Sequence, residues 1–187
     1  MSKRLFLAIP ILPENTLVKQ KKFLQSNLSE ERINWIKDEN LHLTLKFIGK
    51  TPSGKIQEII NAIGTCLQSF NSFPIVLDHL GVFGSKYQSK VIWIGLKENK
   101  ILQDLYLKIS IALENIGIPI DRQNFVPHFS LARIKKINHK DHFQRVMDRV
   151  GKGIIQESTV NEIVLFESNL FSDGPVYTKN HSFKLST

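Results

Sequence analysis

The segment HLTLKFIG, residues 42–49, carries a histidine and a hydroxyl side chain in a pattern typical of a β-strand. Successive side chains of a strand point to opposite faces, so His42, Thr44 and Lys46 are expected to share one face, with the leucines and Phe47 on the other. Two residues of a strand span roughly 6.5–7 Å, which lets the imidazole and the hydroxyl converge on one small anion. A lone histidine on a strand is more often structural or merely exposed, so this segment alone does not define a site.

The segment PHFSLAR, residues 127–133, repeats the arrangement, with His128 and Ser130 on one face of a second predicted strand. Two imidazoles with ordinary pKa values near about 6.5 can hold opposite protonation states near neutral pH, so one can accept a proton while the other donates one. The two hydroxyls can donate hydrogen bonds to an anion. Together the segments predict an acid–base pair with an anion cradle. By simple alternation Arg133 falls on the face opposite His128, unless the strand ends or bulges there.

The elements around these segments alternate between strands and helices. The apolar patterns predict strands at residues 4–11, 42–49, 73–83, 90–96, 127–133, 162–168 and 176–185 and helices at 14–28, 51–70, 101–116 and 138–150. Thr51 and Pro52 are predicted to be the N-cap and first-turn proline of the second helix, and Asn138 to cap the fourth. Residues 84–89 between the third and fourth strands predict a hairpin or an adjacent antiparallel pair. The order fits two comparable α+β halves, and no linker divides residues 1–187, so a single domain is expected.

Composition narrows the class of protein and its partners. The chain has 187 residues, of which 42% are hydrophobic and 22% charged, as in soluble globular proteins. Its 25 Lys and Arg against 17 Asp and Glu give a net charge of +8, which favours polyanionic partners such as RNA. No window approaches the 18 apolar residues of a membrane span. The one cysteine, Cys66, cannot form an internal disulfide, so a reducing compartment, the cytoplasm, is expected.

These residues resemble the two-histidine (2H) phosphoesterases, and within them the RNA 2′,3′-cyclic phosphodiesterases of bacteria and archaea, also described as 2′-5′ RNA ligases. The resemblance runs through RLFLAIPI, NLHLTLKFIG, GVFG, VIWIG, FVPHFSLAR and LFESNLFSDGPVYT and covers nearly the whole chain. It implies an α+β, bilobed fold of two pseudo-symmetric halves, with antiparallel sheets lining a central cleft and helices outside. The second motif has Ser130 where threonine is commoner in the family, but serine keeps the hydroxyl donor.

The resemblance implies hydrolysis of RNA 2′,3′-cyclic phosphate ends, tRNA fragments among them, to 2′-phosphomonoesters, together with reversible 2′-5′ RNA ligation. His42 and His128 are expected to act as acid and base in an order that the sequence leaves open. Thr44 and Ser130 are expected to bind the non-bridging phosphate oxygens. Alternatives are a phosphodiesterase acting on small cyclic nucleotides or 2′-5′ oligonucleotides, and a non-catalytic RNA-binding module.

Other residues have two interpretations each. Lys46 and Arg133 are candidate substrate contacts, with a place at the cleft rim or the surface as the alternative. Phe83, Trp93 and Tyr177 are candidates for base stacking, although aromatic residues in strands are more often core. The remaining four histidines are expected to be exposed or locally bonded. Two histidines without a nearby carboxylate or thiol supply too few ligands for zinc, so no metal or cofactor is expected, activity in chelator is expected, and the protein is expected to be a monomer.

Overall fold

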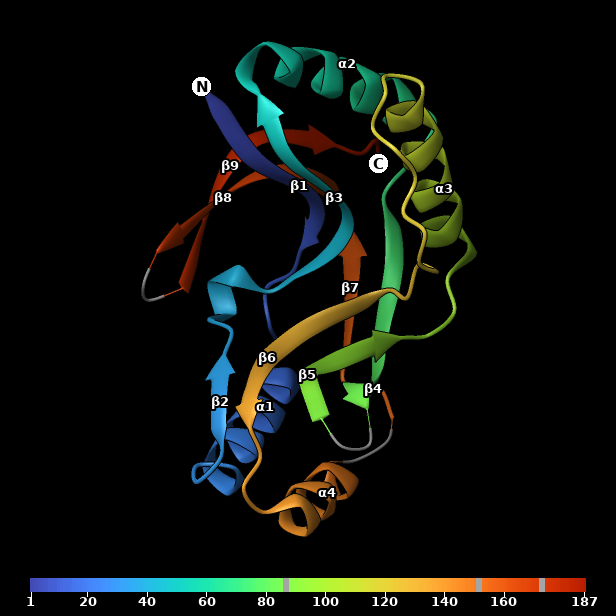
Figure 1. The fold of residues 1–187 in the computed structure, drawn as a ribbon. Coiled ribbons are helices and arrows are strands. Elements are labelled where there is room, and N and C mark those ends of the chain that lie inside the picture. The colour runs from blue at the N-terminus through green and yellow to red at the C-terminus, as the bar shows by residue number, and fades with distance from the viewer. Residues whose placement is uncertain (86–87, 151–152, 172–173) are drawn as a thin grey trace.

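The fold is organised around one curled antiparallel sheet (Figure 1). The computed structural model describes residues 1–85, 88–150, 153–171 and 174–187, and in these ranges nine strands pair in the order β7-β4-β5-β6-β3-β1-β8-β9, with β2 paired to β6. The strands are β1 Ser2–Pro10, β2 Arg32–Trp35, β3 His42–Pro52, β4 Phe73–Ser85, β5 Gln88–Leu96, β6 His128–Lys136, β7 Gln156–Val160, β8 Glu162–Phe171 and β9 Gly174–Lys184. The α-helices are α1 Asn15–Asn27, α2 Ile56–Leu67, α3 Lys100–Glu114 and α4 Lys140–Arg149.

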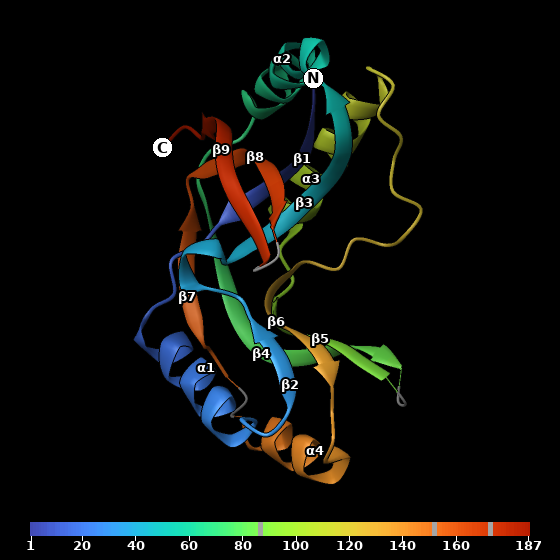
Figure 2. The ribbon, with the colours of Figure 1, turned by 60° about the vertical axis from the view of Figure 1, so that its left-hand side comes forward.

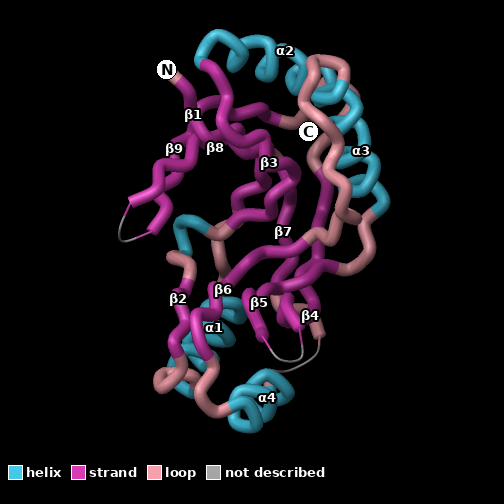
Figure 3. Tube along the Cα trace, in the orientation of Figure 1, coloured by secondary structure: helices cyan, strands magenta, loops and turns pink. Residues whose placement is uncertain are grey.

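The sheet consists of two four-strand halves, β7-β4-β5-β6 and β3-β1-β8-β9, which meet where β6 lies beside β3. Figures 1 and 2 show α2 and α3 at one end of the molecule and α1 and α4 at the other, and Figure 3 shows the strands between them. Each half contributes one histidine-bearing strand. The predicted α+β architecture of two halves with helices outside is therefore confirmed.

Buried apolar stripes explain why the helices pack on the sheet. In α2 and α3 the buried residues recur every three or four positions, which places them on one face of each helix. They are Ile59, Ile63 and Leu67 in α2 and Leu102, Leu105, Ile109 and Leu113 in α3. They join the strand residues in one hydrophobic cluster. Among the described residues no helix is both long and apolar enough to cross a membrane.

Two strands were not predicted from the sequence, β2 (RINW) and β7 (QESTV). Both are short, and neither has a continuous apolar run. β2 pairs along β6, and β7 forms the edge of the sheet beside β4. Their backbone pairing, rather than a hydrophobic pattern, therefore defines them. The predicted hairpin of β4 and β5 is confirmed, while residues 86–87 of its turn lie outside the described residues.

The predicted helix caps are wrong. Thr51 belongs to β3, which continues to Pro52, and its hydroxyl donates to the Gly49 carbonyl at 3.1 Å. A 3₁₀ turn at Ser53–Lys55 then leads into α2. A short-range pattern of cap residues could not reveal that β3 extends this far, because its length is set by pairing with β1.

The fourth helix is also capped differently from the prediction. Its N-cap position is His139, without a side-chain cap, and the side chain of Asn138 instead donates to the Glu30 carbonyl. The buried Glu31 carboxylate accepts from the backbone N–H groups of Asn138 and His139. A partner about a hundred residues away thus satisfies the start of this helix.

Two glycines on adjacent strands, Gly81 and Gly95, leave room for the indole ring of Trp93 to lie against the backbone. Gly81 in β4 lies opposite Trp93 in β5, and a Cβ on Gly81 would lie 2.2 Å from Cζ2 of that indole. A Cβ on Gly95 would lie 2.1 Å from Nε2 of His79. Only residues without a Cβ let the ring lie directly on the backbone.

We expect Gly81→Ala to lower the free energy of unfolding by about 1–3 kcal/mol, the usual cost of overpacking a closed site. Gly54→Ala is the matched control, because nothing lies within 4 Å of its Cβ position. Urea unfolding followed by circular dichroism measures both. Equal unfolding midpoints for the two variants would contradict the packing described for Trp93.

Candidate active site

One residue pair joins the two histidine-bearing strands. Among the described residues, β3 and β6 pair through Leu43 and Phe129, each of which directly follows a motif histidine. Continued by one residue in each direction, this antiparallel register sets His42 against Ser130 and Thr44 against His128. We call the resulting surface the motif face. Its four polar side chains are His42, Thr44, His128 and Ser130, all half-buried.

The backbone fixes the tautomer of both histidines in the same way. Nδ1 of His42 lies 2.7 Å from the carbonyl oxygen of Asn40, and Nδ1 of His128 lies 2.7 Å from that of Val126. A carbonyl oxygen can only accept, so Nδ1 carries the hydrogen in both rings. In the neutral form Nε2 is therefore unprotonated, and it can take up or release a proton in a reaction.

Burial lowers the pKa of both histidines below the ordinary value, because it disfavours the charged imidazolium. The carbonyl hydrogen bonds act in the opposite direction without cancelling this effect. For His42, the positive charges of Arg133 and His128 lower the pKa further. The effect of the His128 charge on His42 is consistent with two imidazoles that lie near each other.

The three aromatic residues considered for base stacking lie around the histidines. The Tyr177 ring is 5.2 Å from that of His42 and the Phe83 ring 4.7 Å from that of His128, both between centroids and both edge to face. Trp93 stacks on Phe83 at 4.7 Å. All three are half-buried, so they serve as walls of the site rather than as fully buried core. Their apolar rings contribute to the burial that lowers the pKa of His42 and His128.

A β-bulge lies three residues after each motif histidine. The extra residue is Leu45 in β3, where the β1 register skips one position, and Leu131 in β6, where the β5 register does the same. A bulge shifts the alternation of side chains by one residue. Beyond it, the fifth residue after each histidine joins the motif face and the fourth leaves it.

The prediction that Lys46 shares the face of His42 is therefore wrong. Lys46 is 2% exposed, its Nζ donates to the Pro119 carbonyl at 2.7 Å, and it forms an ion pair with Asp121 at 2.8 Å. These partners belong to the connection between α3 and β6. Lys46 thus links β3, which bears His42, to the segment that leads into β6, which bears His128.

Arg133 is brought onto the motif face by the Leu131 bulge, against simple alternation. Its side chain is exposed, its charge adds to the lowering of the His42 pKa that burial causes, and it partly offsets the rise that burial causes in the pKa of Tyr177. The guanidinium therefore lies near these two rings. It is a cation that can meet an anion between the histidines.

Phe47 is a candidate that the sequence analysis missed. It pairs with Phe6, the two ring centroids are 6.1 Å apart, and Phe6 lies 5.0 Å from His42. Phe47 therefore lies on the motif face, and it is 64% exposed. The spacing could have revealed it, because Phe47 and Arg133 are each the fifth residue after a motif histidine.

The other four histidines lie outside the motifs and have local surroundings, and one of them, His79, lies beside the site, because its ring is 5.4 Å from that of Trp93. His79 contacts Asp78, His139 contacts Glu31, and His142 lies 2.8 Å from the Asn27 carbonyl, while His181 is exposed. Cys66 is half-buried in α2, and burial raises the pKa of its thiol, as expected for an unreactive cysteine. Within the described ranges, no group of three or more His, Cys, Asp or Glu side chains is arranged to hold a metal ion.

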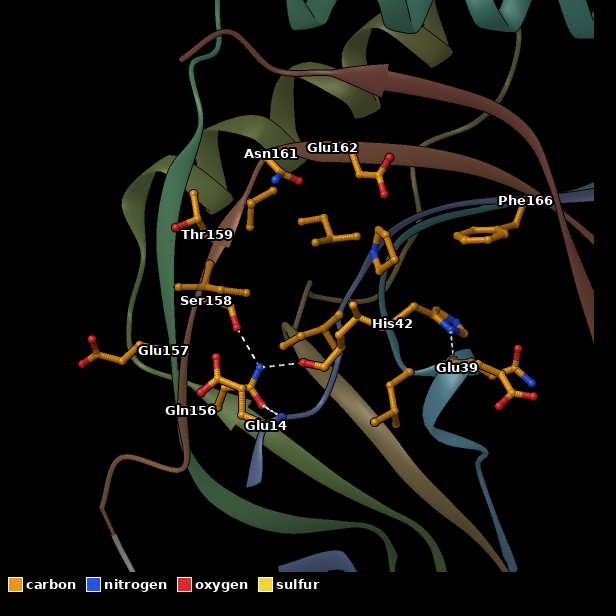
Figure 4. Close-up of a pocket in the computed structure, with 18 of the residues that line it drawn as sticks. Glu14, Glu39, His42, Gln156, Glu157, Ser158, Thr159, Asn161, Glu162 and Phe166 are labelled. Atoms are coloured by element: carbon orange, nitrogen blue, oxygen red, sulfur yellow. Dashed lines mark hydrogen bonds between the residues drawn. The ribbon is translucent and has the colours of Figure 1, made fainter. Parts of the chain in front are cut away.

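A cavity of about 1000 Å³ opens beside His42 (Figure 4). Its walls come from both halves of the sheet, with Phe166 and Tyr177 from one half and Ser158 and Thr159 from the other. In Figure 4, His42 and Phe166 lie across the cavity from Ser158 and Thr159. A space between the halves, as the bilobed fold implied, is therefore present next to one of the two motif histidines.

Comparison with known proteins agrees with this geometry. Residues 9–93 match the sequence model of the family described as LigT like phosphoesterase. A Methanocaldococcus jannaschii protein named RNA 2′,3′-cyclic phosphodiesterase is 33% identical over 174 residues, which cover 93% of this chain and 96% of the relative. The chain belongs to the LigT-like phosphoesterase family. A second relative of the same name, from Methanothermobacter thermautotrophicus, is 27% identical over 99% of this chain and its own full length.

Solved structures share the LigT-like fold. A Thermus thermophilus protein superposes with a TM-score of 0.78 at 23% identity and 97% coverage of both chains. E. coli LigT complexed with 3′-AMP superposes with a TM-score of 0.75 at 22% identity, and each chain is fully covered. The predicted bilobed two-histidine phosphoesterase fold is therefore confirmed.

We expect nitrogen-15 NMR spectra to show both motif histidines of this LigT-like protein as the Nδ1–H tautomer when neutral, with titration midpoints below about 6.5. Long-range proton–nitrogen correlations, assigned with His42→Gln and His128→Gln, measure the tautomer and the midpoint together. An Nε2–H tautomer in either ring would show that the upstream carbonyls do not orient the imidazoles.

Proposed function

We propose that the protein hydrolyses the 2′,3′-cyclic phosphate at the end of an RNA strand and leaves a 2′-phosphomonoester. The observation that carries the proposal is the pair of imidazoles held by backbone carbonyls in the same tautomer, each opposite the hydroxyl of the other motif. This arrangement supplies a proton acceptor, a proton donor and two anion-binding hydroxyls on one face. The names of the relatives support the same substrate.

In the proposed reaction, water attacks phosphorus in line with the departing O3′. Nε2 of the neutral imidazole takes a proton from the water while Nε2–H of the other, protonated imidazole gives one to O3′. The P–O3′ bond breaks as the new P–O bond forms, so one water is added across the cyclic ester. In the proposed 2′-5′ ligation, the 5′-hydroxyl of a second strand attacks the same phosphorus in place of water and O3′ leaves, so His42 and His128 keep their roles. The roles exchange when O3′–H attacks that 2′-5′ linkage, the 5′ oxygen leaves and the cyclic phosphate forms again.

Charge develops on the non-bridging oxygens as phosphorus becomes five-coordinate. We assign Thr44 and Ser130 as hydrogen-bond donors to these oxygens, and Arg133 as a cation that contacts the same phosphate. Phe47 presents an exposed ring on which the terminal base can stack. Lys46, buried in its ion pair with Asp121, has no part in this proposal.

The proposed partner is RNA with a cyclic phosphate end, tRNA fragments included, and the proposed enzyme is a cytoplasmic monomer. The net charge of +8 supports a polyanionic substrate. Small cyclic nucleotides would use the same phosphate chemistry. The two alternatives share the chemistry at phosphorus and differ in the length of the substrate.

We expect His42→Ala and His128→Ala each to lower kcat/KM for 2′,3′-cyclic AMP by about 10²–10⁴-fold, since each removes one proton-transfer group. The reaction is run in chelator, and chromatography separates 2′-AMP from 3′-AMP. His181→Ala, at an exposed histidine outside the motifs, is the control. Parent-level turnover in either motif variant would refute the two-histidine mechanism, and loss of all parent activity in chelator would refute its independence of metal.

The pH dependence follows from the lowered pKa values. The base must be neutral, so its pKa sets the acid limb of kcat/KM, and the acid must be protonated, so its pKa sets the alkaline limb. Burial lowers both, so we expect a bell-shaped profile centred below about 6.5 for the free enzyme. Initial rates at low substrate concentration between about pH 4.5 and 8.5, a range that brackets the ordinary histidine pKa, measure it. A profile that is flat, or centred above neutrality, would contradict the assignment.

A further inference from the structure

The cavity beside His42 is larger than the cyclic phosphate requires. Its volume of about 1000 Å³ lies at the upper end of the range for small-molecule sites, roughly 300–1,000 Å³. His42 and Tyr177 line one end, and the cavity then continues along β8 and β9 and reaches β7. A ligand that reacts at His42 can therefore extend into it.

One wall of this cavity has a preorganised positive charge. The Glu162 carboxylate, with a pKa held at about 2, lies 2.9 Å from Nζ of Lys184 and 3.3 Å from Nζ of Lys179, and it accepts from the Ser182 hydroxyl at 2.8 Å. The lysine side chains are 57% exposed at Lys179 and 72% exposed at Lys184. Two ammonium groups thus share one carboxylate, and each has further N–H donors that face solvent. We call Lys179 and Lys184, with Glu162 between them, the lysine wall.

The lysine wall begins a short distance from the reaction centre. Lys179 and Tyr177 lie on the same face of β9, two residues and roughly 6.5–7 Å apart along the strand. The Tyr177 ring in turn contacts His42. A chain that carries its cyclic phosphate at His42 can therefore place the next phosphate, about one nucleotide away, at Lys179.

The opposite wall, on β7, suits a sugar and a base rather than a phosphate. Gln156 is fixed by three hydrogen bonds, to the Leu12 carbonyl, the Ser158 hydroxyl and the Glu14 N–H. Ser158 accepts in this network, so its own hydrogen remains for a ligand. Asn161 supplies a further hydrogen-bonding group, and Glu14 also lines the cavity on this side, whereas Glu39 lies beside His42. This side would repel a phosphate and accept hydrogen bonds from ribose hydroxyls and base amino groups.

We propose that this cavity binds the nucleotide that precedes the cyclic end, with its 3′ phosphodiester on the lysine wall and its ribose and base against β7. The inference rests on the proposed function and adds a substrate class to it. The enzyme acts on an RNA strand of two or more nucleotides in preference to a cyclic mononucleotide. Binding of the preceding nucleotide in the cavity then distinguishes an RNA strand from a cyclic mononucleotide.

The test compares kcat/KM for ApA ending in a 2′,3′-cyclic phosphate with kcat/KM for 2′,3′-cyclic AMP. We expect the ratio to be at least about tenfold, the effect of one charge-assisted hydrogen bond. In the double variant Lys179→Gln/Lys184→Gln we expect the ratio to fall to within about threefold of unity, since amides replace both ammonium groups. The matched control Lys19→Gln/Lys22→Gln removes the same charge from exposed positions of α1, and it should keep the parent ratio.

A second variant leaves the charge unchanged. Ser158→Trp places an indole into the cavity from the β7 wall and should also reduce the ratio. Circular dichroism melting verifies that each variant is folded. Equal kcat/KM for the two substrates in the parent, or a high ratio that survives both cavity variants, would overturn this inference while leaving the hydrolysis intact. Turnover of neither substrate by the parent would instead overturn the proposed function.

Discussion

The site depends on the contact between Leu43 and Phe129. These residues form the pairing between β3 and β6 in the described chain, and both side chains are at most 1% exposed. Because each directly follows a motif histidine, burying this pair in the core sets the register of the neighbours on the opposite face. A slip of one residue would place each imidazole beside an apolar side chain instead of a hydroxyl. The hydrophobic core and the geometry of the site are therefore specified by the same two residues.

Three local features recur in both motif strands around this contact. A carbonyl two residues upstream fixes each imidazole, and a bulge three residues downstream shifts the alternation. The second residue after the bulge then lies on the motif face. What differs between the halves is the side chain there, an aromatic ring at Phe47 and a guanidinium at Arg133. The two motif strands thus share these backbone features and differ in the side chain at this position.

The sequence predicts the site better than it predicts the surroundings. The shared face of His42 with Thr44, and of His128 with Ser130, could be predicted because the alternation of polar and apolar residues over these three positions precedes the bulges and is undisturbed by them. Lys46 was misplaced because a bulge arises from pairing with β1, which no local pattern records. β2 and β7 were missed for a similar reason: RINW and QESTV become strands through their partners β6 and β4. The lysine wall escaped notice because Glu162 and Lys184 are brought together by the hairpin of β8 and β9.

The near repetition of the two halves has a consequence for the sense of the reaction. The backbone features that recur in both halves hold the two imidazoles in the same way. These features alone give no preference for one end of a nucleic-acid strand. An RNA strand, however, is directional. The polarity of the strand can be recognised by features that differ between the halves. These are Phe47 in one half against Arg133 in the other, and the cavity beside His42 with the lysine wall on one side. In the proposed reaction, the repeated elements would supply the chemistry and the elements that differ would supply its direction.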